Sequence, residues 1–287
     1  MSNATTMDQF KQRIIEEWTD PGAVAAWRKW SPQFAIFLRE ATDVLVEAAH
    51  VQRGMQVLDL ASGTGEPALT LAERVGSTGH VTATDLGSGM LAIAEENAHS
   101  QGLANMSFRQ ADVHQLPFAD RQFDLVSCRF GVMYFADCAK AMQEIARVLK
   151  PGGRVVLAAW GSLERNQFIT VFLMPFLKRV QPPPPQPGAP HPFKFAVPGS
   201  LSSELSNASF GHVAEAFHAL KLPFPGTPED IKQEMLDVSA PFHPIINGLE
   251  PIERGKAMAE VLAGYRQCYD GKYVNTTGTI VLATGVR

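Results

Sequence analysis

The sequence is short of cysteine and has no stretch of about 18 consecutive apolar residues, and each shortage excludes a class of protein. Its three cysteines are an odd number without C-x-x-C spacing, so neither a disulfide framework nor a thiolate metal site is expected. The missing apolar run argues against an integral membrane segment. We therefore expect a cytoplasmic protein without a metal.

The sequence also lacks a large excess of either charge. It has 25 lysine and arginine residues and 29 aspartate and glutamate residues, for a net charge of −4. Nucleic acids and anionic membranes select a basic surface, and the sequence contains no run of basic residues. Nucleic acid is therefore not an expected partner. A chain of 287 residues, 45% of them hydrophobic, can bury a full core, but its composition leaves the oligomeric state open.

The most informative stretch is residues 57–65, VLDLASGTG. It begins as a short apolar run that is typical of a buried parallel strand and then becomes a loop of small residues. Glu66 and Pro67 follow, and proline is favoured in the first turn of a helix. Strand, glycine-rich turn and helix together predict the first unit of a nucleotide-binding α/β fold.

The loop alone is ambiguous, because residues 63–68 also fit the dinucleotide fingerprint G-x-G-x-x-A. Asp59 favours another ligand, since its carboxylate would repel a pyrophosphate bound at this turn. S-adenosylmethionine has no phosphate there and presents an ammonium group that a carboxylate suits. The sequence therefore predicts a site for this methyl donor, with a nicotinamide-dependent oxidoreductase as the alternative. Its expected loop residues are Asp59, Ala61, Ser62, Gly63 and Gly65.

Strands and helices alternate between residues 57 and 160, which predicts a doubly wound, mainly parallel sheet. The second strand ends at Asp85, 20 residues after Gly65, where a carboxylate meets the hydroxyls of a ribose. Beyond residue 160, strands over 213–222 and 279–286 with helices between them predict an antiparallel edge whose hairpin loop is expanded into a cap.

The expected organisation is a helical cap over residues 1–50 and a main domain over 51–287, with lid insertions at about 162–199 and 226–272. Residues 181–192 contain seven prolines and can form neither a helix nor a central strand. We expect the N-terminal aromatic residues to pack in the core, and only Trp27 and Trp30 are candidates for lining a pocket.

Several motifs occur together in the order and spacing of a known family: residues 57–65, 84–85, 111–113, 116–118, 123–126 and 148–153. In these motifs the chain resembles the class I S-adenosylmethionine-dependent methyltransferases. It is most similar to the ubiquinone/menaquinone-biosynthesis C-methyltransferases and their small-molecule relatives, over roughly residues 50–160.

The resemblance implies a Rossmann-like seven-stranded sheet with a reversed, antiparallel last strand. It also implies Asp85 on the ribose, Leu86 and Met90 beside the adenine, and Asp112 with Val113 at the adenine amino group. Ala61 departs from the family pattern, which has glycine there, and we expect alanine to fit if its φ stays below zero.

The acceptor side is less determined. Arg129 and Tyr134 follow the fourth strand, where an open α/β sheet places its ligand crevice, so both are candidates for positioning the acceptor. The alternative for Arg129 is an internal ion pair with Asp137 or Asp124. The expected reaction is methyl transfer to carbon or oxygen of a small, partly apolar organic acceptor. A protein that binds the donor without transferring its methyl group remains an alternative.

Overall fold

Three helices precede the first strand in the structure, a computed structural model that describes residues 3–182, 186 and 188–287. They are α1 (Asn3–Thr19), α2 (Pro21–Phe37) and α3 (Arg39–Ala49). Asp20 begins α2, because its side chain accepts a hydrogen bond from the Ala23 amide at 2.8 Å and Pro21 occupies the first turn. The helices expected in this region are therefore present.

The alternation predicted for residues 57–160 is confirmed. Its elements are β1 (Gln56–Leu60), α4 (Ala68–Val75), β2 (His80–Asp85), α5 (Ser88–Ser100), β3 (Met106–Gln110), β4 (Phe123–Arg129), the short 3₁₀ turn η1 (Val132–Tyr134), α6 (Cys138–Val148) and β5 (Leu149–Trp160). Helix α6 begins at Asp137, whose side chain accepts from the Lys140 amide.

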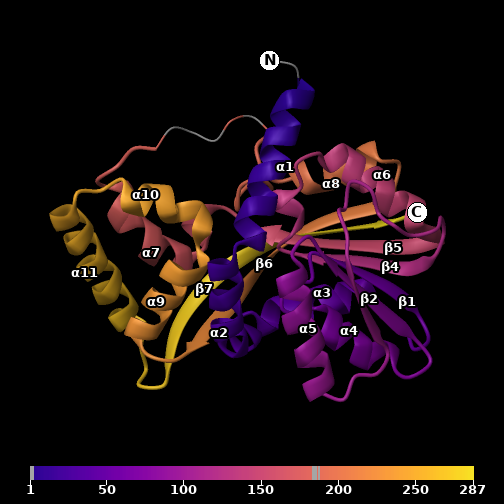
Figure 1. Ribbon diagram of the computed structural model, residues 1–287, viewed down its shortest axis with the longest axis horizontal. Helices are drawn as coiled ribbons and strands as arrows, with labels where there is room; N and C mark the ends of the chain where they lie inside the picture. The colour runs from indigo at the N-terminus through magenta and orange to yellow at the C-terminus, as the bar shows by residue number, and fades with distance from the viewer. Residues whose placement is uncertain (1–2, 183–185, 187) are drawn as a thin grey trace.

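The C-terminal part adds two long strands and a group of helices. Its elements are η2 (Leu163–Arg165), α7 (Gln167–Leu177), α8 (Ser200–Asn207), β6 (Gly211–Pro225), α9 (Pro228–Val238), η3 (Ala240–Phe242), α10 (His243–Asn247), α11 (Pro251–Gln267) and β7 (Tyr273–Val286). The two strands are longer than predicted and extend beyond the rest of the sheet toward α9 and α11 (Figure 1). The hairpin between them therefore carries the helices, as predicted.

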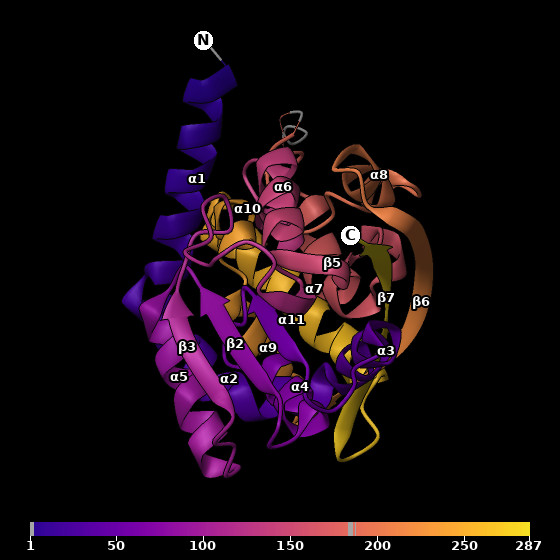
Figure 2. The same cartoon turned by 90° about the vertical axis from the view of Figure 1, so that its right-hand side faces the viewer.

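All seven strands form one sheet in the order β3-β2-β1-β4-β5-β7-β6. The pairs from β3 to β5 are parallel, and β7 is antiparallel to both of its neighbours (Figure 2 shows the β3 side). The seven-stranded sheet with an antiparallel last strand is thus confirmed. Side chains of β1 and β4 such as Val57, Leu58, Leu125 and Val126 are fully buried, which is typical of a parallel sheet covered on both faces.

The end of the proline-rich segment, at residues 189 and 190, lies beside helix α1. Four of its prolines, at positions 183–185 and 187, lie outside the described residues. Beyond them, the Arg13 guanidinium of α1 donates to the Pro190 carbonyl at 3.2 Å, and Ala189 packs with Phe10 of the same helix. The end of this segment therefore contacts α1.

Candidate active site

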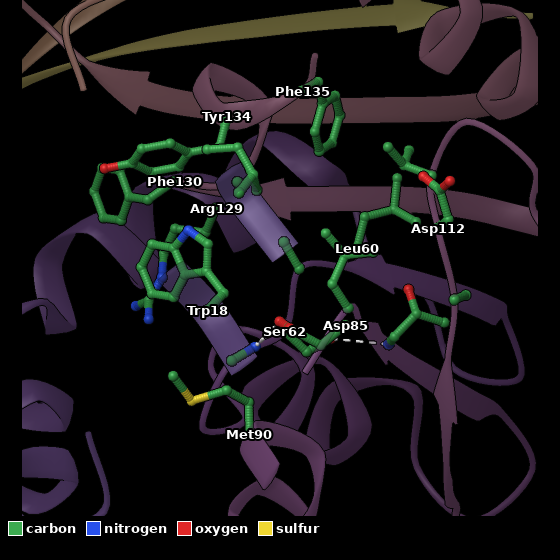
Figure 3. A pocket seen from close by; sticks show the side chains of 18 of the residues that line it. Trp18, Leu60, Ser62, Asp85, Met90, Asp112, Arg129, Phe130, Tyr134 and Phe135 are labelled. Atoms are coloured by element: carbon green, nitrogen blue, oxygen red, sulfur yellow. Dashed lines mark hydrogen bonds between the residues drawn. The ribbon is translucent and has the colours of Figure 1, made fainter. Parts of the chain in front are cut away.

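The last residues of β1, β2 and β4 lie side by side at the carboxyl edge of the sheet. Leu60 of β1 pairs with Thr84 of β2 and with Cys128 of β4, so the residues that follow each of them leave the sheet side by side. This is the point between β1 and β4 where the strand order reverses, and open α/β sheets place their ligand crevice there. A pocket opens at this point (Figure 3).

Asp85 holds the loop after β1 at the pocket. Its Oδ2 accepts from the Gly63 amide and its Oδ1 from the Gly87 amide, both at 2.9 Å. Burial raises the pKa of Asp85, and these amide hydrogen bonds oppose the rise because they favour the charged form. Each carboxylate oxygen has a second lone pair, so Asp85 can still accept from two ligand hydroxyls.

The lining residues come from four strand ends and from the N-terminal helices. The predicted residues among them are Ala61, Ser62, Gly63, Asp85, Leu86, Met90, Asp112, Val113, Arg129 and Tyr134. Asp59 and Gly65 were also predicted, but they do not line the pocket. Gly65 packs so closely that a Cβ there would approach Leu69 Cδ1 to 2.8 Å, which explains glycine at this position.

Asp59 is fully buried beneath the loop instead of reaching the cavity. Its Oδ1 accepts from the Ser127 hydroxyl at 2.6 Å, and its Oδ2 is buried without a hydrogen-bond partner among the described residues. Burial raises the pKa of Asp59 to about 7, against the opposing effect of the Ser127 hydrogen bond. Its contact with a donor ammonium stays a prediction.

Ala61 departs from the expectation of a negative φ, because its φ is 53°. This left-handed conformation favours glycine, and for alanine it costs about 1–2 kcal/mol. The alanine methyl is accommodated because Gly131 lies opposite: a Cβ added at Gly131 would be 2.4 Å from the Cβ of Ala61. The missing family glycine is therefore tolerated through a glycine on another loop.

Asp112 is held by two side chains at the end of the pocket near β3. Lys11 of α1 forms a salt bridge with Oδ2, and the His114 ring nitrogen Nδ1 lies 2.6 Å from Oδ1. Because His114 Nε2 accepts from the Asp137 amide, its Nδ1 is the donor to Asp112. Burial opposes ionisation of Asp112, but the hydrogen bonds from His114 and Lys11 outweigh it and lower the pKa.

Arg129 and Tyr134 lie in the part of the pocket next to β4 (Figure 3). Arg129 does not form the ion pair considered above: Asp124 binds Lys150 at 2.7 Å, and Asp137 caps α6. Burial raises the pKa of Tyr134, and the nearby Glu17 adds to this effect. The Tyr134 hydroxyl therefore stays protonated near neutral pH.

The N-terminal helices contribute residues that the sequence did not single out. Trp18 lines the pocket with the predicted Trp27, and its ring lies 5.8 Å from that of Trp27 and 5.5 Å from that of Tyr134. Trp30 does not reach the pocket, because its Nε1 donates to Asp237 of α9 at 2.8 Å. The sequence predicted core packing for Trp18, because which surface its helix contacts depends on tertiary packing.

Comparison with known proteins identifies the central region. Residues 51–170 match the family model described as a methyltransferase domain. This region is similar to the class I S-adenosylmethionine-dependent methyltransferase domains. The match includes β1 to β5 with the loops that line the pocket, while the helices α1 and α2 above it lie outside.

Curated relatives match the same part of the chain. It is similar to the ubiquinone/menaquinone biosynthesis C-methyltransferase UbiE of Idiomarina loihiensis, with 39% identity over 113 residues, 39% of this chain and 45% of the relative. The UbiE protein of Bdellovibrio bacteriovorus is 44% identical over 119 residues, 42% of this chain and 50% of that protein. The chain thus spans half or less of the length of these two relatives.

A solved structure shares the fold of this chain beyond the matched region. The YcgJ protein of Bacillus subtilis superposes with a TM-score of 0.55 and 20% identity, covering 87% of this chain and 98% of that one. These findings do not favour the nicotinamide-dependent alternative. In the part of the chain that the structure describes, none of the helices is long and apolar enough to cross a membrane.

The strained loop predicts an unusual pair of effects. Ala61→Gly removes the left-handed penalty, partly offset by the added freedom of the unfolded chain, so we expect a gain of up to about 1 kcal/mol. Gly131→Ala should destabilise the protein, because its methyl would approach Ala61 Cβ to 2.4 Å. Thermal denaturation of both variants and of the double variant tests this. Without partial rescue in the double variant, the contact between the two residues is not the cause.

The buried Asp59 predicts a pH-dependent difference in stability. Because its pKa is raised from 3.8 to about 7, the native protein keeps a proton that the unfolded chain has released between these values. The free energy of unfolding therefore falls as pH rises through this window. We measure the melting temperatures of Asp59→Asn and of the wild type between pH 5 and pH 8. The melting temperature of the variant minus that of the wild type should increase as the pH rises.

Asp124→Asn is the control for this measurement. Asp124 is paired with Lys150 at the opposite end of the same sheet, so its loss should bring no gain in stability as pH rises. A pH-independent difference between Asp59→Asn and the wild type would show that Asp59 is ionised in the folded protein throughout.

Proposed function

We propose that this protein transfers a methyl group from S-adenosylmethionine to carbon or oxygen of a small, partly apolar organic acceptor. The observation that carries the proposal is the convergence of the glycine-containing loop, Asp85 and aromatic side chains of α1 and α2 on one pocket. The domain match over residues 51–170 and the similarity to C-methyltransferases support it. We also retain a cytoplasmic location without a nucleic-acid partner as part of the proposal.

The pocket fits the donor in its charges and its apolar surface. Asp85 has free lone pairs for the ribose hydroxyls, while Leu86, Met90 and Val113 offer apolar surface to the adenine. Both oxygens of Asp112 already accept hydrogen bonds or a salt bridge, so a contact with the adenine amino group would add to these.

The buried, unpartnered Oδ2 of Asp59 is a further observation that fits a donor. An ammonium group near Ala61 and Gly63 would lie on the side of the loop opposite this carboxylate. Its positive charge would favour the ionised form of Asp59 over the protonated one. The donor would in this way reduce the cost of a carboxylate that has too few partners.

Catalysis in this proposal rests on orientation and on exclusion of water. When bound, S-adenosylmethionine supplies an activated methyl group on a sulfonium. The chain has to hold both reactants within about 3–3.5 Å and in line, which can lower the barrier by several kcal/mol. Trp18 and Trp27 cover the pocket from the side of α1 and α2, and Tyr134 lines it from the turn after β4, so that the three rings reduce its contact with water.

Turnover distinguishes the proposal from a protein that only binds the donor. Incubation with S-adenosylmethionine and a panel of small phenols, enols and aromatic acids should release S-adenosylhomocysteine and a proton and give a product in which a methyl group replaces a hydrogen of the acceptor. Calorimetric titration with S-adenosylhomocysteine and with NAD separates the donor from a nicotinamide cofactor. If the protein binds NAD but does not bind S-adenosylhomocysteine, the proposal is contradicted.

Replacing Asp85 should weaken donor binding strongly. A hydrogen bond to a charged group contributes about 1.5–3 kcal/mol, so Asp85→Ala should lower the affinity for S-adenosylhomocysteine by roughly tenfold to a hundredfold. Asp124→Ala, at the other end of the sheet, is the matched control and should bind normally. Calorimetry on folded variants tests this, and unchanged affinity in Asp85→Ala would remove Asp85 from the donor site.

The N-terminal helices should move when ligands bind. We predicted a mobile cover made of these helices and of residues 162–199 and 226–272, but it is α1 and α2 that line the pocket. The two insertions support them from behind, through Pro190 against Arg13 and Asp237 against Trp30. Hydrogen exchange should therefore slow in residues 7–37 when S-adenosylhomocysteine binds, more than in α6. Equal exchange with and without the ligand would indicate a static cap.

A further inference from the structure

We propose that Arg129 is the anion-binding residue of the acceptor site, and that the acceptor is a flat apolar molecule with a carboxylate or another oxyanion. This inference rests on the proposed function and names its substrate class. It starts from a cation that the fold places in the pocket with fewer partners than its chemistry demands.

The guanidinium of Arg129 is left largely unpartnered. Its Nη1 donates to the Thr42 hydroxyl, and its Nε is buried without a partner among the described residues. In that part of the chain Arg129 also forms no salt bridge, although a guanidinium carries five N–H donors. A buried charged donor without an acceptor is costly, which makes an anion from outside the chain the fitting partner.

The nearest acidic residues do not take this role. Glu66 accepts from the Thr70 hydroxyl at 2.9 and 3.1 Å, and Asp59 lies beneath the loop with its Oδ1 on Ser127. Burial lowers the pKa of Arg129, while the charges of Glu66 and Asp59 raise it without contact. Their field lets the guanidinium stay charged and leaves its donors free for a ligand.

One aromatic ring lies beside this cation, and two more line the same pocket. The guanidinium carbon of Arg129 lies 5.8 Å from the centre of the Phe130 ring, and Trp18 and Tyr134 also line the pocket (Figure 3). Phe130 is itself held by stacking on Trp160, with ring centres 4.0 Å apart. A guanidinium in a pocket that is also lined by aromatic rings favours a flat molecule whose oxyanion accepts hydrogen bonds from it.

The carboxylate of the donor's amino-acid tail shares this chemistry, but the placement favours the acceptor. Asp85 and Gly63, which mark the donor, belong to the β2 and β1 side of the crevice. Arg129 ends β4 and has its hydrogen-bond partner Thr42 on α3, on the other side of β1. The Asp85 carboxylate and the Arg129 guanidinium thus lie in different parts of one pocket.

Paired probes test the proposal directly. Benzoate and 2-naphthoate, with the neutral isosteres benzamide and 2-naphthamide, are titrated into the protein with and without S-adenosylhomocysteine. We expect the wild type to prefer the anions, and Arg129→Met to lose roughly tenfold to a hundredfold in anion affinity. Affinity for the amides and for S-adenosylhomocysteine should not change. Absence of anion binding in the wild type would overturn the proposal.

Arg109→Met is the matched control. The guanidinium carbon of Arg109 also lies near an aromatic ring, 5.2 Å from the centre of Phe118, but Arg109 is exposed and lies outside the pocket. It should leave every affinity unchanged. A second variant, Arg129→Lys, keeps the charge but not the planar fork, and should retain part of the anion affinity. The melting temperature of Arg129→Met should equal or exceed that of the wild type, since it removes a partly buried charge that has no salt bridge among the described residues.

The other outcomes are distinct. If Arg129→Met loses affinity for S-adenosylhomocysteine and keeps that for 2-naphthoate, Arg129 belongs to the donor site and the proposal is overturned. If Arg129→Met melts early and Arg129→Lys restores stability without anion binding, Arg129 is structural and the proposal is overturned as well. If S-adenosylhomocysteine does not bind the wild type, the proposed function fails, while the titrations without it still report on Arg129.

Discussion

The structure depends on the common register of β1, β2 and β4. Because Leu60 pairs with both Thr84 and Cys128, the chain leaves the sheet at three neighbouring points of one edge. The Ser62 amide donates to the Thr84 carbonyl at 2.9 Å, and Asp85 takes the next amide of the loop. A one-residue slip would turn every side chain of a strand to the other face, so the buried core holds the site in place.

The site concentrates polar groups that the core would otherwise exclude. Within the described residues, the buried side-chain atoms without a partner are Oδ2 of Asp59, Nε of Arg129 and Oε1 of Gln33. Two of these three belong to the crevice between β1 and β4, and the strained Ala61 lies beside them. Local violations of packing rules are expected where a ligand completes the structure. The positive charge of the proposed donor would stabilise the Asp59 carboxylate across the loop, and the proposed acceptor would offer an anion to the Arg129 guanidinium.

The N-terminal helices turn an open crevice into a closed pocket. Helix α1 is tied at Lys11 to Asp112 and at Arg13 to Pro190, and α2 is tied at Trp30 to Asp237. Each tie joins residues far apart in the sequence and lies partly in solvent, where a single polar contact contributes little. A cover of this kind can open for ligands without disturbing the sheet, which depends on fully buried strands.

The sequence by itself determined the features that local chemistry encodes. Alternating apolar strands and periodic helices specified the doubly wound sheet, and the turn after residue 60 with an acid 20 residues beyond Gly65 specified the loop and Asp85. Tertiary structure alone decided that Ala61 has a positive φ, since the room for its methyl comes from Gly131. It also decided that Trp18 lines the pocket and that Asp59 does not, because helix docking and burial depend on contacts that no local pattern contains.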